Sequence, residues 1–97
     1  MTQENLAYRA LALQIACRAV NHCTDRVSAR TRMSESIDRV GRHVRAAKAF
    51  HGADLRLVVL PEYFLTGYPL GESIPEWADK AALAPDGPEY EALARIA

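Results

Sequence analysis

The chain has 97 residues, of which 49% are hydrophobic and 25% charged, and its 12 basic and 12 acidic side chains give a formal net charge of zero. This length allows one domain at most, and the composition is that of an ordinary globular protein. No apolar run approaches the roughly 20 residues that span a bilayer, which excludes a transmembrane helix, and two cysteines are too few for a disulfide framework.

A β-strand is expected over about residues 8–17, after a lead-in of residues 1–7. Apolar side chains alternate there with small or polar ones, and the apolar positions are Leu11, Leu13, Ile15 and Cys17. A period of two residues is typical of a strand, although the many alanines leave a helix as an alternative. Because the N-terminus lacks the basic start and apolar stretch of a secretory signal, we expect a cytoplasmic protein.

A long helix is predicted over about residues 33–50. An apolar stripe with steps of three and four residues runs along it, formed by Met33, Ile37, Val40, Val44, Ala47 and Phe50. The start of the helix is open, because Thr24, Asp25 and Ser34 can each act as its N-cap, whereas Gly52 is suited to end it. Basic side chains fall off the stripe, so we interpret them as a solvated face and expect no nucleic-acid binding.

A second strand is predicted over residues 55–60, buried on both faces because its run of Leu and Val is broken only by Arg56. Strand, helix and strand form a βαβ unit, so the fold class is α/β, and the carboxyl ends of the two strands share one edge. Residues 14–20 and Glu62 are expected to meet there, since Pro61 ends the strand and Glu62 follows it. By position alone, Glu62 is either a reactive carboxylate or an ordinary loop or capping residue.

The glutamate loop, residues 61–69, is followed by a mixed segment, residues 70–79. The length of this segment suggests a binding loop or lid. Trp77, the only tryptophan, is interpreted as an anchor of that loop or as a substrate contact. The turn at residues 85–88 and the acidic residues after it predict a helix that begins at about Pro88.

The sequence LVVLPEYFLTGYP, residues 57–69, resembles the glutamate motif of the nitrilase superfamily, the carbon–nitrogen hydrolases. The resemblance extends over residues 8–97. It implies a four-layer αββα sandwich that dimerises, of which this chain forms the βαβ start, and a Glu-Lys-Cys triad without a metal or an organic cofactor. It also implies that Glu62 is the general base and that Tyr63 lines the substrate pocket. The implied substrates are small molecules that carry an amide, nitrile or carbamoyl group.

The other two members of the triad have no match in this sequence. Lys80 comes too soon after the glutamate motif, and Cys17 and Cys23 precede Glu62, whereas the nucleophile of the family follows it. We interpret Cys17 as a buried thiol at a strand end and Cys23 as a free thiol in a loop, because their spacing with His22 fits no standard zinc pattern.

We therefore expect an N-terminal part of a hydrolase, incomplete in this chain, inactive alone and forming a homo-oligomer. The alternative is a non-catalytic interaction module, or a decayed paralogue, that associates through open sheet edges or through the apolar face of the helix.

Overall fold

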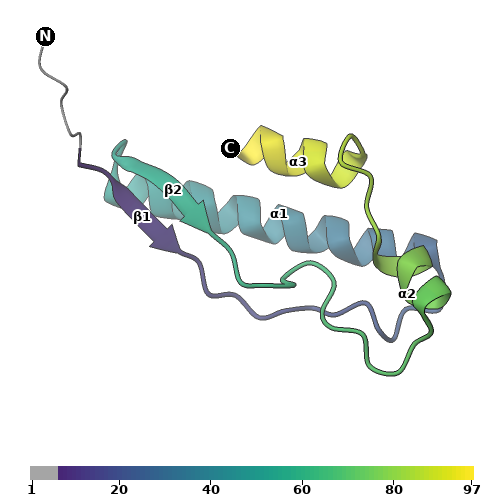
Figure 1. Ribbon diagram of the computed structural model, residues 1–97. Helices are drawn as coiled ribbons and strands as arrows, with labels where there is room; N and C mark the ends of the chain where they lie inside the picture. Colours follow the sequence, from purple (N-terminus) through teal and green to yellow (C-terminus); the bar gives the residue numbers. More distant parts are fainter. Residues whose placement is uncertain (1–6) are drawn as a thin grey trace, which may run out of the picture.

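A βαβ unit forms the first part of the fold (Figure 1). The computed structural model describes residues 7–97, so most of the lead-in expected at residues 1–7 lies outside the described residues. β1 (Arg9–Ala12) and β2 (Leu55–Val59) are parallel neighbours, and the 26-residue α1 (Arg26–His51) connects them. The predicted α/β class is confirmed. Residues 7–97 contain a single two-stranded sheet and do not form the four-layer sandwich that the resemblance implies.

Two short helices complete the chain, α2 (Ile74–Ala81) and α3 (Pro88–Ile96), and both pack against α1 (Figure 1). The helix predicted from Pro88 is confirmed, whereas the prediction of a loop over residues 70–79 is correct for residues 70–73 and wrong from Ile74, where α2 begins. Ser73 caps α2, because its hydroxyl accepts a hydrogen bond from the Glu76 N–H over 3.3 Å and the Glu76 carboxylate accepts one from the Ser73 N–H over 3.4 Å. None of the described helices combines the length and hydrophobicity needed to cross a bilayer.

β1 is shorter than the strand predicted over residues 8–17. It pairs only where β2 provides a partner: Ala12 lies opposite Val59, and the Leu13 N–H donates to the Val59 carbonyl over 2.9 Å. β2 ends there, and Pro61 follows shortly after without an N–H for a further ladder bond. Residues 13–17 consequently continue without a strand partner.

One face of the sheet is covered and the other is open. Partners in a parallel ladder point to the same side, so Leu11 and Val58 share one face, where both are half-buried. Ala12 and Val59 share the other face, where Val59 is 53% exposed and the neighbouring Leu57 is 44% exposed. The prediction that β2 is buried on both faces is wrong for this chain, because none of the described elements covers that second face.

α1 begins well before the predicted start at residue 33. Asp25 is its N-cap: the carboxylate accepts a hydrogen bond from the Ser28 N–H over 2.8 Å, so Ser34 lies inside the helix rather than at its start. Gly52 ends the helix as predicted, with a φ of 96° and its N–H donating to the Lys48 carbonyl over 2.9 Å.

The core lies between the first half of α1 and the loop after β2. Its buried side chains are Val20, Ala29, Met33, Ile37 and Leu65. The predicted stripe of α1 continues into this core, but it fails at its last member: Phe50 is 84% exposed, where α1 extends past α3 (Figure 1). The core is therefore concentrated under the glutamate loop rather than under the sheet.

Candidate active site

The glutamate loop, residues 61–69, forms a compact turn directly after β2, with Glu62 as its second residue. Tyr63 has a left-handed backbone with a φ of 55°, which is uncommon for a residue with a side chain. Its carbonyl accepts hydrogen bonds from the N–H groups of Thr66 (3.3 Å) and Gly67 (2.9 Å). Backbone strain of this kind is concentrated at functional sites, and here it immediately follows the candidate base.

Hydrogen bonds attach the glutamate loop to the segment that follows β1. The Val20 N–H donates to the Thr66 carbonyl over 3.0 Å, and the Cys17 thiol donates to the Tyr63 carbonyl over 3.4 Å. Residues 14–20 therefore meet the glutamate loop at the carboxyl edge of the sheet, but these bonds reach Tyr63 and Thr66 rather than Glu62, with which contact was expected.

Gly67 allows the closest approach between these two segments. Its φ is 77°, and a Cβ at this position would lie 2.6 Å from the Cβ of Ala19. Beside it, the Asn21 amide donates to the Tyr68 carbonyl over 2.8 Å. A glycine is required here both by the backbone conformation and by the space available.

Glu62 is exposed, and Tyr68 is its polar partner: the Tyr68 hydroxyl donates to Oε2 of Glu62 over 3.5 Å. The rings of Tyr63 and Tyr68 pack side by side, with their centroids 4.4 Å apart. The charge of Glu62 is the main cause that raises the pKa of Tyr68 above its ordinary value of 10.0. Nothing in the sequence patterns indicated this contact of Tyr68 with the carboxylate.

Residues 7–97 do not enclose Glu62. Its side chain faces solvent, because the described elements cover only the α1 side of the sheet. Glu62 is placed at the predicted edge, but nothing among these residues encloses it.

A cavity of about 480 Å³ lies between the glutamate loop and α2, and Glu62 is not among the residues that line it. Tyr63 and Trp77 both line it, so the predicted pocket position of Tyr63 borders an actual hollow, while its contact with a substrate stays a prediction. Trp77 is half-buried and also packs against the core, as expected of an anchor.

Glu72, which lines this cavity, belongs to a polar network. Oε2 of Glu72 accepts a hydrogen bond from the Asn21 amide over 2.9 Å, and Oε1 accepts one from the Leu70 N–H over 2.5 Å. These hydrogen bonds lower the pKa of Glu72 from its ordinary value of 4.5, and the bond from the Leu70 N–H has the largest effect. The Lys80 ammonium donates to the carbonyls of Asn21 (2.9 Å) and Cys23 (3.3 Å) and lies 4.0 Å from Glu72. Lys80 therefore ties α2 to the loop after β1 rather than approaching Glu62.

The two cysteines are free thiols, and they differ in solvent exposure. Cys17 is exposed, which corrects the prediction of a buried thiol, because the strand ends before it; Cys23 is half-buried against the core. Among the described residues, no three His, Cys, Asp or Glu side chains come together as a metal site.

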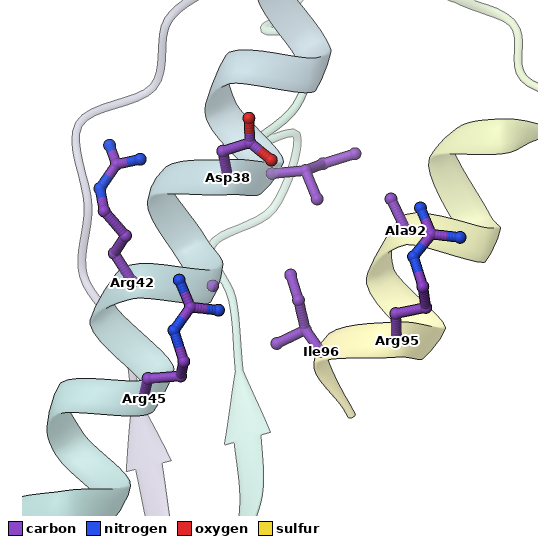
Figure 2. Close-up of a pocket in the computed structure, with 8 residues that line it drawn as sticks. Asp38, Arg42, Arg45, Ala92, Arg95 and Ile96 are labelled. Atoms are coloured by element: carbon purple, nitrogen blue, oxygen red, sulfur yellow. The ribbon is translucent and has the colours of Figure 1, made fainter.

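A second hollow, of about 380 Å³, lies between α1 and α3. Arg45 on α1 and Arg95 on α3 flank it, and Ile96 points into the gap between the two helices (Figure 2). Arg95 is paired with Glu91 on its own helix over 3.1 Å. None of the candidate site residues lines this hollow.

Comparison with known proteins supports the family resemblance of the sequence. A family model described as carbon–nitrogen hydrolase matches residues 8–97, which include both strands, all three helices and the glutamate loop. No curated protein matches the chain, and no solved structure does. Because the family match covers nearly all of the sequence, the chain belongs to the carbon–nitrogen hydrolases of the nitrilase superfamily.

Proposed function

We propose that this chain supplies the general base, Glu62, of a cysteine-dependent hydrolase that cleaves a non-peptide carbon–nitrogen bond in a small amide, nitrile or carbamoyl compound. The observation that carries the proposal is the position of Glu62 directly past the carboxyl end of β2, on a turn that is hydrogen-bonded to the segment after β1. Ligand sites of open α/β sheets lie at this edge.

The proposed chemistry begins with Glu62 accepting the proton of a cysteine thiol, which produces the thiolate nucleophile. For an amide, the thiolate attacks the carbonyl carbon, and a lysine stabilises the oxyanion. Glu62 then returns the proton to the departing amine or ammonia, which leaves a thioester. A water molecule that gives its proton to Glu62 attacks the thioester, and the carboxylic acid is released while the thiol regains the proton.

The lysine and the nucleophilic cysteine of this scheme are proposed to come from outside residues 1–97. Lys80 is engaged by two carbonyls and by Glu72, and Cys17 donates to the carbonyl of Tyr63. We accordingly propose that residues 1–97 are inactive by themselves and act within an intact hydrolase.

The test is Glu62→Gln in that intact hydrolase, with ammonia release as the measurement. Removing a general base is expected to lower turnover by about 10²–10⁴-fold. Glu76→Gln is the matched control, because glutamine can still complete the capping box of α2. Turnover of Glu62→Gln within about tenfold of the wild type would remove Glu62 from the mechanism.

A second candidate function, association without catalysis, is favoured by one observation: the open sheet face exposes Leu57 and Val59. In this proposal a second copy of the chain covers that face, which yields a homo-oligomer. Light scattering on the chain and on Leu57→Lys tests it. A dimer that becomes a monomer on substitution supports the proposal, and a monomeric wild type contradicts it.

A further inference from the structure

We propose that the cavity between the glutamate loop and α2 receives the apolar group of a neutral amide substrate, an inference that rests on the proposed hydrolase function. This cavity is named the Tyr63–Trp77 groove, and the apolar side chains that line it include Tyr63, Pro69, Ile74, Trp77, Ala78 and Ala81. Its volume of about 480 Å³ falls in the range of small-molecule pockets, which are mainly apolar with a few polar groups.

The shape of the groove follows from the residues of α2. Ala78 and Ala81 are three positions apart and lie on one face of the helix, so their small side chains leave space where larger residues would fill it. Trp77 is held in place because it packs against the core and has the Lys80 ammonium 5.9 Å from its ring centroid. The groove is therefore bounded by an aromatic ring that is already fixed in position.

The groove is connected to the candidate base by direct contacts. Tyr63 lines the groove, its ring packs on Tyr68 at 4.4 Å, and the Tyr68 hydroxyl reaches Glu62 over 3.5 Å. A molecule seated against Tyr63 thus lies two side chains from the carboxylate. This continuity distinguishes the groove from the arginine-flanked hollow beside α3, which shares no lining residue with it.

The charges at the groove favour a neutral occupant. Among the described residues that line the groove, only Glu72 has a charged side chain. Its hydrogen bonds lower its pKa, so Glu72 is an anion at neutral pH. The nearby Lys80 is already engaged by two carbonyls and by Glu72. A ligand carboxylate would lose water beside apolar side chains without gaining a free cation, which is unfavourable.

The experiment uses Trp77 as a reporter, since it is the only tryptophan of the chain. Phenylacetamide, its anionic counterpart phenylacetate, and acetamide are titrated into the chain while the Trp77 emission and the NMR signal of its indole N–H are followed. We expect saturable binding of phenylacetamide, no saturation by acetamide, and binding of phenylacetate weaker by about tenfold or more, because its charge must be desolvated.

Two matched variants locate the binding. Ala78→Leu places a larger side chain in the groove and is expected to weaken phenylacetamide binding by about tenfold. Ala94→Leu makes the same change at an exposed position of α3 away from the groove and leaves binding unchanged. Circular dichroism reports whether both variants keep their helices. Absence of saturation, equal binding of phenylacetate, or equal effects of the two variants each overturns the inference.

A parallel measurement in the intact hydrolase separates this inference from the proposed function. Ala78→Leu should lower kcat/KM for phenylacetamide relative to acetamide by about tenfold. An unchanged ratio, together with loss of turnover in Glu62→Gln, would show that the groove inference is wrong while the proposed function stands. Full turnover in Glu62→Gln would reject the proposed function whatever the titrations show.

Discussion

The two ends of α1 lie in different environments. Its first half belongs to the loop side of the molecule, where Met33 and Ile37 are buried against the glutamate loop, α2 and α3. Its last turns belong to the sheet side, where Phe50, Leu57 and Val59 are largely exposed. A buried core thus lies beneath the glutamate loop, whose outer residues Glu62, Tyr63 and Tyr68 are exposed, whereas one face of the sheet lacks such a core.

This difference explains how a small and open fold can still position its candidate base. The radius of gyration is 16.2 Å, whereas a compact domain of this length has about 12.5 Å, so the described elements are spread out rather than centred on one core. The loop side is nonetheless fixed by buried side chains and by backbone hydrogen bonds such as that from Val20 to Thr66. The position of Glu62 therefore depends on the loop side, not on a completed sheet.

The largest effect should come from emptying the loop-side core. Met33→Ala removes a fully buried side chain and is expected to lower the free energy of unfolding by about 2–5 kcal/mol. Phe50→Ala, the control on the sheet side, removes a side chain that is 84% exposed and should change the free energy of unfolding by no more than about 0.5 kcal/mol. Urea unfolding followed by Trp77 fluorescence measures both. Similar losses for the two variants would contradict the distinction between the two sides.

A somewhat smaller effect is expected where the glutamate loop meets the segment after β1. In Gly67→Ala the new Cβ would lie 2.6 Å from the Cβ of Ala19, at a position whose backbone is left-handed. Because the steric clash and the backbone strain both destabilise the fold, a loss of about 2–4 kcal/mol in the free energy of unfolding is expected. Gly71→Ala has a comparable backbone, with a φ of 98°, but no atom within 4 Å of the added Cβ, so only the backbone term of about 1–2 kcal/mol remains. If both variants lose the same free energy of unfolding, close packing of Gly67 against Ala19 does not contribute to the stability of the glutamate loop.

The features predicted correctly from the sequence are those set by local chemistry. Pro61 ends β2 and places Glu62 at the strand edge, Gly52 ends α1, and Pro88 begins α3. Each depends on the backbone conformation or hydrogen-bonding capacity of a residue and its immediate neighbours, which a single sequence contains.

The features missed depend on distant partners or on a choice between local signals. β1 is short because β2 ends at Val59, and Glu62 is exposed because nothing described faces it. The start of α1 required a choice among Thr24, Asp25 and Ser34. The Ser73–Glu76 capping box was a local signal for α2 that the interpretation as a mixed loop overlooked.

The smallest effect on stability is expected at Asp25, the N-cap at which α1 begins. The backbone N–H and the hydroxyl of Ser28 lower the pKa of Asp25 from its ordinary 3.8. A lowered pKa in the folded state means that the contribution to stability is present above pH 3.8 and is lost as the pH falls through the folded-state pKa.

Asp25→Asn retains a capping side chain but removes the titration. The stability difference between the wild type and this variant should therefore be small and constant near neutral pH and should shift toward the variant below pH 3.8. Thermal unfolding at several pH values measures it, with Glu35→Gln as a control at an exposed position of the same helix. A difference that does not change between pH 6 and pH 3 would show that the charge of Asp25 contributes nothing to the stability of the helix start.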